Sequence, residues 1–239
     1  MHIASRGEPL GEYGVRLAIV HSEQSSRAER DELAQRLRVT VLDEYSSEEL
    51  TRVALECPSH CYHIEEDAAY IEIVEIGTDN PVPEGVLGEV IGTNLNSRAM
   101  PLIRYRQGDL ATLEPRRRCD CGSNFRALAS IDGRVHDAFL TPSGRVVPGG
   151  ALMDAAYHWR LSLGLPVHGL EYVITQERLD RVVVDIVPPD GFRQGMDAPI
   201  VRQLERLLGE GVAVVLRLVD SIPSQGRKRR SIVSLVNVT

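Results

Sequence analysis

The stretch MPLIRYRQGDL, residues 100–110, is typical of the middle of the chain. It is an apolar run that is interrupted by polar residues and followed by Gly108 and Asp109 near its end. Two similar runs precede it, AYIEIVEI at 69–76 and GVLGEVIGTNL at 85–95, and Gly, Pro and Asn separate the runs. Short alternating runs with such breaks are typical of antiparallel strands. We therefore predict a small β-barrel or curled sheet here, with a carboxylate at the end of one strand.

The segment upstream has the pattern of a strand, a helix and a second strand, at residues 14–22, 25–38 and 39–45. The helix is marked by a serine at its start, an acidic residue three or four positions later and helical spacing of charges. Strands that alternate with helices predict a parallel α/β layer. One helix and two strands cannot cover both faces of such a sheet, so we predict only part of a layer.

The last third of the chain, after DGRVHD at 132–137, combines strands and helices in a different order. The expected elements are a strand with a hairpin through 141–145, a helix at 149–163, strands at 170–177 and 180–189, a helix at 197–210 and a strand at 212–222. This β-α-β-β-α-β order predicts a ferredoxin-like domain. The expected domains are residues 1–132, made of an α/β piece (1–56) and a β subdomain (57–132), and residues 133–239.

Composition and charge restrict the class of protein. Apolar residues make up 43% and charged residues 26% of the 239 residues, as in a soluble globular protein. The formal net charge of −7 argues against a general nucleic-acid binder, which needs a basic surface. No window approaches the roughly 18 apolar residues of a membrane helix, and the start lacks the apolar stretch of a signal peptide. We expect a cytoplasmic protein without membrane or nucleic-acid partners, whose cysteines are ligands, catalysts or core residues and not disulfides.

Two short segments gather cysteine and histidine, CPSHCYH at 57–63 and CDCG at 119–122. Zinc prefers four such ligands in a tetrahedron, and two close pairs joined by strands can converge on one ion. The spacing therefore predicts a zinc site. The alternative is that Cys57 and Cys61 pack in the core while the second segment is only a loop.

Three further segments carry groups suited to a nucleotide. In DEYSSEEL at 43–50 an aromatic ring and carboxylates follow an apolar strand, and ligands of α/β sheets bind at the carboxyl ends of strands. A Glu at this position can hold Mg²⁺. The alternative is that Ser46 or Ser47 is the N-cap of a helix. Asp109 has two acceptor oxygens that match a ribose diol, and Gly108 allows the backbone to turn; the alternative is a simple turn.

The basic run in SIPSQGRKRRSIV, residues 221–233, can stabilise charge on a transferring phosphoryl group, although a solvated basic loop explains it equally well. The sequence contains neither a G-x-x-x-x-G-K-[ST] phosphate loop nor a G-x-S-x-G elbow. The absence of the phosphate loop removes one large class of nucleotide enzymes, and the nucleophile elbow of the α/β-hydrolases is missing as well.

Taken in order, the segments resemble the acyl-adenylate-forming (AMP-forming) ligases, and within them the phenylacetate–CoA ligase-like branch, which also includes adenylating proteins of the capsular-polysaccharide-biosynthesis type. MPLIRYRQGDL nearly repeats the branch's P-L-I-R-Y-R-T-G-D, and CDCG its C-x-C-G. The other similar segments are SRGEPL, YSSEE, ECPSHCYH followed by EIVE, DGRVHD and IPSQGRKRRSIV. The resemblance spans nearly all of the chain.

The resemblance implies roles for the nucleotide-binding candidates. Tyr45 would stack on adenine, and Glu49 would hold Mg²⁺ near the phosphates. Asp109 would bind the ribose hydroxyls, and Arg134 would approach the same ribose.

The resemblance also implies a structural zinc site formed by Cys57, His63, Cys119 and Cys121. If one of these four is not a ligand, Cys61 is the first candidate to replace it, and His60 would not bind the ion. The C-terminal domain would be mobile and swing about a hinge near His136. In one position it would bring a catalytic lysine to the adenylation site, for which the candidates are Lys228 and its neighbour Arg227.

The implied activity is that of an AMP-forming carboxylic acid ligase, which converts an acid and ATP to acyl-AMP and pyrophosphate and can then pass the acyl group to CoA. The branch's chain is much longer on its N-terminal side, where its phosphate loop and most of its acid pocket lie. The alternatives are therefore an inactive nucleotide- or partner-binding remnant, or one half of a split ligase completed by a separately encoded N-terminal half. A homodimer is a further expectation.

The sequence departs from the branch within its motifs as well. Ser46 stands in place of a Gly, Glu48 in place of a Ser or Thr, and His136 in place of the hinge Asp. Arg227 directly follows Gly226, where the branch has its lysine, and Lys228 is one position late. Arginine keeps the charge and binds phosphate, but it does not replace lysine in other respects.

Overall fold

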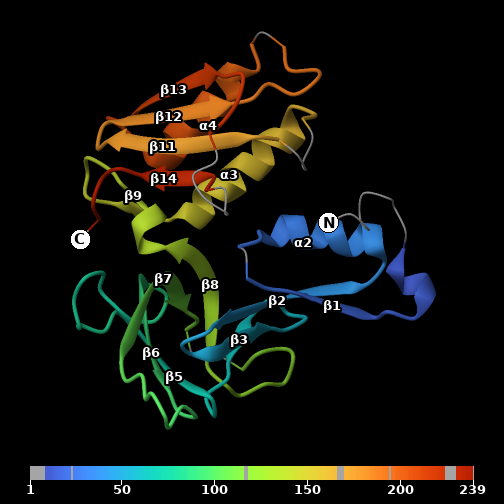
Figure 1. The fold of residues 1–239 in the computed structure, drawn as a ribbon, viewed down its shortest axis with the longest axis vertical. Helices are drawn as coiled ribbons and strands as arrows, with labels where there is room; N and C mark the ends of the chain where they lie inside the picture. Colours follow the sequence, from blue (N-terminus) through green and yellow to red (C-terminus); the bar gives the residue numbers. More distant parts are fainter. Residues whose placement is uncertain are drawn as a thin grey trace. The chain divides into compact units, whose positions relative to one another are not determined.

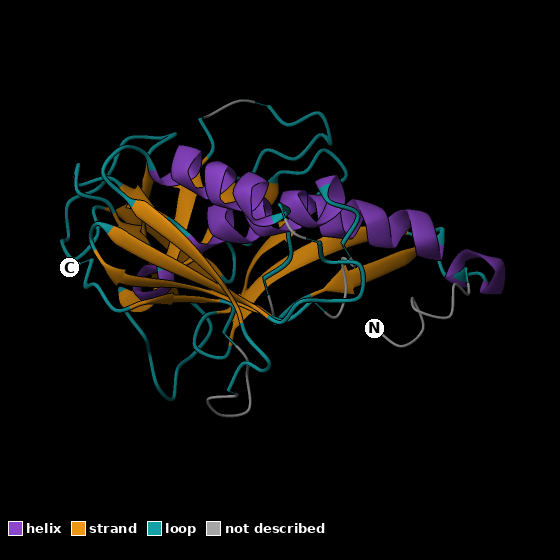
Figure 2. Ribbon diagram, turned by 90° about the horizontal axis from the view of Figure 1, so that it is seen from above, coloured by secondary structure: helices purple, strands orange, loops and turns teal. Residues whose placement is uncertain are grey.

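The computed structural model describes residues 9–22, 24–115, 118–165, 170–193, 195–223 and 230–238. The chain divides into two compact units, Met1–Asp132 and Gly133–Thr239. Each unit combines several strands with few helices (Figure 1, Figure 2). The prediction of a mixed α/β chain with more than one sheet is confirmed. No helix within these ranges is long and apolar enough to cross a membrane.

The first unit is built on one eight-stranded sheet with the order β1-β2-β3-β4-β8-β7-β6-β5. β1 and β2 pair in parallel, and the other strand pairs with a defined register are antiparallel. The elements are η1 (Leu10–Tyr13), β1 (Leu17–Val20), α2 (Arg27–Leu37), β2 (Thr40–Ser47), β3 (Thr51–Glu56), β4 (Tyr62–Ile64), β5 (Ala69–Val74), β6 (Leu87–Asn94), β7 (Tyr105–Leu113) and β8 (Ala127–Arg134).

The predicted parallel strand–helix–strand piece is present as β1, α2 and β2. A capping box starts the helix: Ser26 Oγ accepts from the Glu29 N–H at 3.2 Å, and Glu29 Oε2 accepts from the Ser26 N–H at 2.9 Å. The helix lies along β1 and β2 (Figure 1). The apolar cluster beneath it contains Leu10, Ala18, Val20, Leu33, Ala34, Leu37, Val39 and Val41. On the opposite side of β1, Leu17 and Ile19 are exposed.

β2 continues past the α/β layer and turns back into β3. The alternative in which Ser46 or Ser47 caps a helix is wrong, because both residues lie in β2 and pair with β3. Ser47 Oγ accepts a hydrogen bond from the Leu50 N–H at 3.1 Å and so stabilises a turn, which is the other local role of a serine hydroxyl. Leu50 is fully buried against Gly92, where an added Cβ would lie 2.1 Å from Leu50 Cδ1.

The rest of the sheet is curled, with an apolar core between its strands. β3 contacts β5, although four other strands separate them in the sheet order. The core contains Leu50, Val53, Ala54, Ile64, Ala69, Ile71, Ile73, Val90, Ala111 and Leu128. β1 and β5 are its two edges, so the sheet is open and is not the closed barrel among our predictions. The strands of both expected pieces, 1–56 and 57–132, belong to this one sheet.

The second unit has a four-stranded sheet, with α3 and α4 packed around its apolar core. The fully buried Trp159 and Phe139 lie in that core. Its elements are η2 (Val135–Asp137), β9 (Phe139–Leu140), β10 (Val146–Val147), α3 (Gly149–Ser162), β11 (Tyr172–Arg178), β12 (Arg181–Ile186), α4 (Asp197–Leu208), β13 (Ala213–Leu218) and β14 (Ile232–Ser234).

The second unit differs from the ferredoxin-like prediction in its outer strand. The strand expected before the first helix is β9, which pairs only with β10 in a separate hairpin. β14 takes the edge position and pairs in parallel with β11, giving the order β13-β12-β11-β14. The buried Gln176 joins the hairpin to the sheet, because its side chain donates to Leu140 O at 2.7 Å and accepts from Leu140 N at 3.0 Å.

Candidate functional site

Tyr45 and Asp109, two of the predicted nucleotide-binding residues, lie in contact on β2 and β7. The Tyr45 hydroxyl donates a hydrogen bond to Asp109 Oδ2 at 2.8 Å. The Gln107 side-chain amide donates to the same hydroxyl. Gly108 has a φ of 77°, a left-handed conformation that glycine adopts without strain, and the side chains on both sides of it reach Tyr45. The left-handed glycine therefore allows β7 to present an amide and a carboxylate to one phenol.

β7 does not end at Asp109, as the sequence suggested, but continues to Leu113. Leu110 and Ala111 are fully buried, so core packing extends the strand past the glycine. Tyr45 is 9% exposed, and its ring belongs to the core of the curled sheet. The hydroxyl is thus the polar end of a side chain whose position is fixed by packing, and the half-buried Asp109 lies beside it.

Glu49 is exposed at the turn between β2 and β3. Its backbone carbonyl accepts a 2.8 Å hydrogen bond from the buried side chain of Asn94, and its Oε1 accepts from the Tyr105 hydroxyl at 3.3 Å. The turn is therefore anchored from β6, while the carboxylate reaches solvent, where a cation can approach it.

The remaining predicted site residues, Arg134 for the nucleotide and Arg227 and Lys228 for catalysis, belong to the second unit. Arg134 is the last residue of β8 and is exposed. Arg227 and Lys228 lie outside the described residues. His136, in the predicted hinge, accepts a 2.8 Å hydrogen bond from Arg230 on its Nε2, which ties η2 to the segment that leads into β14.

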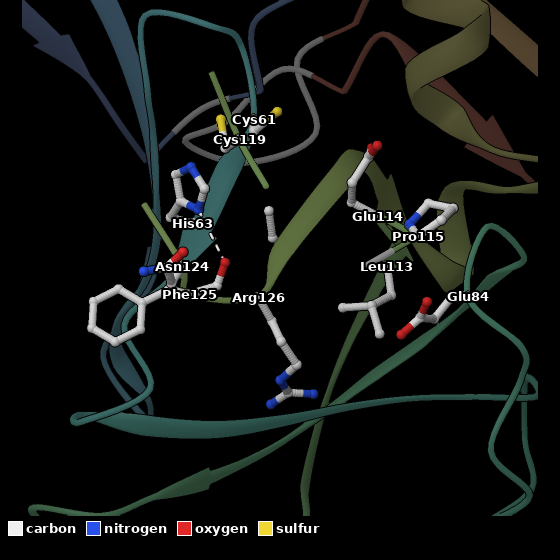
Figure 3. A pocket seen from close by; sticks show the side chains of 11 residues that line it. Cys61, His63, Glu84, Leu113, Glu114, Pro115, Cys119, Asn124, Phe125 and Arg126 are labelled. Carbon is white, nitrogen blue, oxygen red and sulfur yellow. Dashed lines mark hydrogen bonds between the residues drawn. The ribbon is translucent and has the colours of Figure 1, made fainter. Parts of the chain in front are cut away.

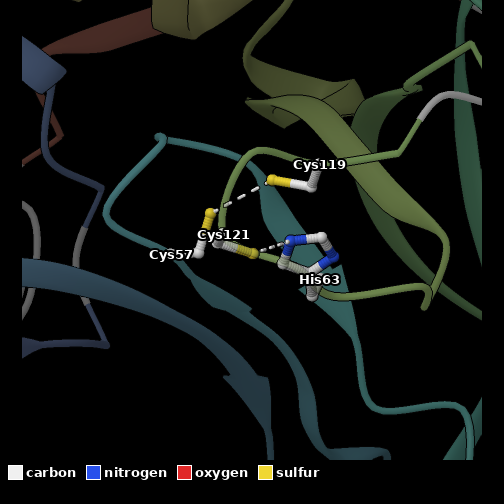
Figure 4. A group of neighbouring side chains, drawn as sticks. All are labelled: Cys57, His63, Cys119 and Cys121. Carbon is white, nitrogen blue, oxygen red and sulfur yellow. Dashed lines mark hydrogen bonds between the residues drawn. The ribbon is translucent and has the colours of Figure 1, made fainter.

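The four predicted zinc ligands converge. One ligand atom from each of Cys57, His63, Cys119 and Cys121 lies within 4.8 Å of all the others (Figure 4). The Cys57 and Cys119 sulfurs are 3.7 Å apart, and Cys121 Sγ is 3.2 Å from His63 Nε2. Two thiolates on a tetrahedral zinc, each about 2.3 Å from the ion, are about 3.8 Å apart. The donor set and its spacing therefore fit zinc.

Local backbone structure holds these side chains in place. His63 lies in β4, and its Nδ1 is 3.3 Å from the Phe125 carbonyl, to which only an N–H can donate. That bond leaves the lone pair on Nε2 facing Cys121, as a metal-binding histidine requires. The turn at Gly122, whose φ is 88°, brings Cys121 back towards Cys119, and the Ser123 N–H donates to Cys121 Sγ at 3.5 Å.

The thiols influence one another's ionisation. The pKa of Cys119 is lowered to about 6, chiefly by hydrogen bonding from the Cys121 backbone and further by the Cys121, His63 and Cys57 side chains. The pKa of Cys121 is raised: the Ser123 N–H works to lower it, but desolvation and the neighbouring thiols outweigh that bond. The metal-free cluster thus favours one thiolate over several adjacent ones.

Cys61 and His60 lie outside the four-ligand group. Cys61 is buried, its Sγ points to the Ser59 carbonyl at 3.8 Å, and it lines a cavity of about 50 Å³ together with His63 and Cys119. Figure 3 shows these three residues on one side of the cavity and Glu84 with Glu114 on the other. Pockets for small ligands are typically about 300–1,000 Å³, so this cavity does not hold a substrate.

A buried charged network next to the four-ligand group was not predicted. Arg30 of α2, which is 6% exposed, contacts the carboxylates of Asp43 and Glu56 and the Tyr62 hydroxyl at 3.0–3.5 Å. Burial works to lower the pKa of Arg30, but Tyr62, Glu56 and Asp43 outweigh it and raise that pKa. The sequence signal for this network is slight: an arginine in a predicted helix and a Glu before Cys57.

Comparison with curated proteins finds phenylacetate–coenzyme A ligases. The ligase from Pseudomonas putida is 33% identical over 138 residues, which are 56% of this chain and 30% of that protein. The ligase from Thermus thermophilus is 32% identical over 147 residues, 60% of this chain and 33% of that protein. The matches therefore span about a third of the length of these relatives. A scan against protein-family models finds no match.

Solved structures of acyl-CoA ligases share the fold. 2-Hydroxyisobutyryl-CoA ligase in the postadenylation state, in complex with R3-HIB-AMP, has a TM-score of 0.74 at 20% identity and covers 98% of this chain and 52% of its own. Its open conformation, in complex with 2-HIB-AMP and CoA, has a TM-score of 0.66 at 21% identity, with 97% and 53% covered. ATP-bound MatB from Rhodopseudomonas palustris has a TM-score of 0.61 at 16% identity, with 96% and 45% covered.

The chain thus spans about half the length of these solved ligases and has the fold of that half. Its fold and ordered motifs are those of the AMP-forming ligase superfamily, and the assignment made from the motifs is confirmed. Within that superfamily, the curated relatives that it matches are phenylacetate–coenzyme A ligases.

Proposed function

We propose that this chain is part of an AMP-forming carboxylic acid ligase, which joins an acid to ATP to give acyl-AMP and pyrophosphate and then passes the acyl group to CoA. The contact between the Tyr45 hydroxyl and the Asp109 carboxylate carries this proposal. It brings together an aromatic ring and a diol acceptor from two motifs that are far apart in the sequence.

Asp109 is proposed to bind the ribose. An ionised carboxylate has about four acceptor positions and can accept from both hydroxyls of a ribose diol. Hydrogen bonds to a charged acceptor contribute about 1.5–3 kcal/mol each. The bond from Tyr45 also restricts the rotation of the carboxylate, which reduces the entropy lost when a nucleotide binds.

Tyr45 and Glu49 are proposed to complete the contacts to the nucleotide from the first unit. The ring of Tyr45 would stack on adenine, an interaction worth about 1–3 kcal/mol for a base on an aromatic side chain. Glu49, exposed at an anchored turn, would supply a carboxylate oxygen to Mg²⁺ beside the phosphates, as this hard cation prefers.

The second unit is proposed to contribute cations to the reaction. Arg134 would approach the ribose, and Lys228, or Arg227 in its place, would stabilise the negative charge that develops when the acid displaces pyrophosphate at the α-phosphate. Movement of this unit about a hinge near His136 would bring the lysine to the adenylation site.

We further propose that Cys57, His63, Cys119 and Cys121 bind a structural zinc ion. Four protein ligands leave no open position for a substrate, which is the pattern of structural and not of catalytic zinc. The ion would join the turn before β4 to the loop before β8, and so fix one end of the curled sheet.

A complete ligase would need further polypeptide, corresponding to the part of the solved ligases that this chain does not cover. The exposed apolar residues Leu17 and Ile19 on β1 are the proposed contact for it, because strands of a parallel layer are normally covered on both faces. Pyrophosphate release with a panel of aryl and short acids, measured with and without that polypeptide, tests the activity. Turnover that requires this chain together with the further polypeptide supports a split ligase. No turnover with or without that polypeptide contradicts the ligase assignment.

Calorimetric titration with AMP tests the nucleotide site separately. Asp109→Asn should weaken binding by about tenfold or more, since 1.4 kcal/mol corresponds to a factor of ten. The control is Asp79→Asn, which changes another carboxylate of the same unit that is largely exposed. If Asp109→Asn binds AMP as tightly as the control, the ribose role is wrong.

A further inference from the structure

The turn that carries Cys57 is held by a side-chain contact that the four metal ligands do not provide. His60 Nδ1 lies 2.9 Å from Glu56 Oε1, and the His60 side chain is 31% exposed. Glu56 ends β3, directly before Cys57, and its side chain is 1% exposed. A carboxylate accepts and cannot donate, so the His60 ring donates its N–H to Glu56.

The Glu56 carboxylate is fixed from outside the turn. Arg30 of α2 donates to Oε1 at 3.1 Å through a terminal nitrogen, and its Nε lies 3.1 Å from Oε2 in an ion pair. The Asp43 N–H on β2 donates to Oε2 at 2.9 Å. The bond from His60 is thus one of three hydrogen bonds to a carboxylate that two other elements hold in place. His60 is the member of this set that lies in the metal-binding segment.

The backbone of the turn depends on the conformation of His60. Its φ is 61°, in the left-handed region that few residues other than glycine, Asn, Asp and His adopt. In this conformation its N–H donates to the Cys57 carbonyl at 2.8 Å, while the Cys57 N–H donates to the Cys61 carbonyl at 2.9 Å. These bonds set the direction in which the Cys57 side chain leaves the backbone, towards Cys119.

From these contacts we propose that His60 and Glu56 are positioning residues of the metal centre, a role that rests on the proposed zinc site. They do not bind the ion. They hold the turn so that Cys57 Sγ is already directed at the other ligands before metal binds, and they connect that turn through Arg30 to helix α2. Without the His60 side chain the turn would have to be ordered at the expense of binding free energy, so zinc affinity would fall.

A purely structural role for His60 predicts a different result. If the contact only stabilised the fold, its loss would lower the stability of the metal-free protein and leave the affinity of the folded protein for zinc unchanged. The partly exposed His60 side chain makes this separation practical, because replacing it leaves Arg30, Asp43 and Glu56 paired with one another.

The test is zinc affinity, measured by competition with a chromophoric chelator on the full chain. His60→Gly and His60→Asp both tolerate the left-handed conformation, and each removes the donor to Glu56. We expect each to weaken zinc binding by about 10- to 100-fold, the usual effect of losing a group that orients metal ligands. His60→Asn also tolerates this conformation and carries an N–H donor near the position of Nδ1, so it should recover most of the affinity. Asp185→Asn, in an exposed ion pair of the second unit, is the control and should bind zinc like the wild type.

Urea denaturation of the metal-free proteins completes the experiment. His60→Gly and His60→Asn should unfold near the wild-type midpoint, so a loss of zinc affinity in His60→Gly is separate from a loss of stability. The inference is overturned if His60→Gly and His60→Asp bind zinc as tightly as the wild type, or if His60→Asn is as weak as they are. A wild-type protein that binds no zinc overturns the zinc site itself as well. Wild-type zinc binding with unaffected His60 variants leaves that site standing and removes only this role.

Discussion

The Tyr45 hydroxyl donates to Asp109 Oδ2 across 2.8 Å, although the two residues are 64 positions apart in the chain. The eight-stranded sheet brings them together, since β2 and β7 both face the apolar core of its curled part. The geometry depends on a buried ring on one strand and a left-handed glycine on the other.

The ring and the hydroxyl of Tyr45 can be separated by two substitutions. Tyr45→Leu removes the stacking surface and should weaken AMP binding by about 5- to 150-fold, the equivalent of 1–3 kcal/mol. Tyr45→Phe keeps the ring and loses only the two hydrogen bonds of its hydroxyl, to Asp109 and from Gln107, so its effect on AMP affinity should be much smaller. Calorimetric titration with AMP measures both. Equal losses in the two variants would show that adenine does not stack on this ring.

Removal of one thiol tests the zinc proposal. Cys119→Ser should lose the metal, which elemental analysis should find at about one zinc per wild-type chain. Because binding to a structural site contributes directly to folding, the variant should also unfold at a lower urea concentration. Cys61→Ser, which changes the buried thiol outside the four-ligand group, is the control and should keep the metal. The zinc site would be contradicted if the purified wild-type protein contained no metal and unfolded at the same urea concentration as Cys119→Ser.

Asp43→Asn should change how stability depends on pH. Burial raises the pKa of Asp43 in the folded protein, against the opposing effect of Arg30, so the folded state disfavours its charged form. The resulting cost is present above the raised pKa and disappears as the pH falls through that value towards the ordinary value near 4. On lowering the pH from 7, the wild type should therefore gain free energy of unfolding relative to Asp43→Asn.

Urea denaturation followed by circular dichroism at several pH values measures this difference. Asp31→Asn, an exposed carboxylate on the same helix as Arg30, is the control and should differ little from the wild type across the range. A wild type that instead loses stability relative to Asp43→Asn on acidification would mean that the Arg30 charge outweighs burial.

Gly92→Ala should destabilise the first unit, because the new Cβ would lie 2.1 Å from Leu50 Cδ1 in a fully buried contact. Overpacking of this kind costs about 1–3 kcal/mol. Leu50→Ala makes room for the added methyl group, so the double variant should be less destabilised than the sum of the two single ones. Additive losses would show that Gly92 and Leu50 do not compete for the same space.

Much of this fold follows from local sequence patterns. The parallel strand–helix–strand piece was predictable because α2 has a complete capping box and because β-branched residues mark β2. β5 and β11 were predictable from their alternation of buried and partly exposed residues. β6 and β12 are buried along most of their length and were predictable as short apolar runs between turn residues. In these elements local propensity and tertiary packing agree.

The missed elements have little local signal. β4 is three residues long, and its Tyr62 and His63 fall in the CPSHCYH segment, for which the sequence indicates metal ligands and no strand. β14 is equally short and lies beyond the last expected strand, so only its pairing with β11 makes it a strand. Ser46 and Ser47 are typical helix caps, yet their pairing with β3 overrides that preference.

The residues of the candidate site likewise divide into those that the sequence indicated and those that it did not. The roles of Tyr45, Asp109 and the four metal ligands were expectations from motifs, and the structure brings these residues into two clusters. Gln107 and Arg30 were not candidates, because their contacts join strands and helices that only the folded sheet brings together. A long-range polar contact leaves no periodic trace in the sequence of either partner.

The central claim is that Asp109 binds a ribose diol beside the ring of Tyr45, and a crystal structure with AMP bound tests it most directly. We predict both ribose hydroxyls within hydrogen-bond distance, about 2.7 Å, of the Asp109 carboxylate, with adenine against Tyr45. AMP bound elsewhere on the chain, or bound with Asp109 in contact only with Tyr45, would contradict the account.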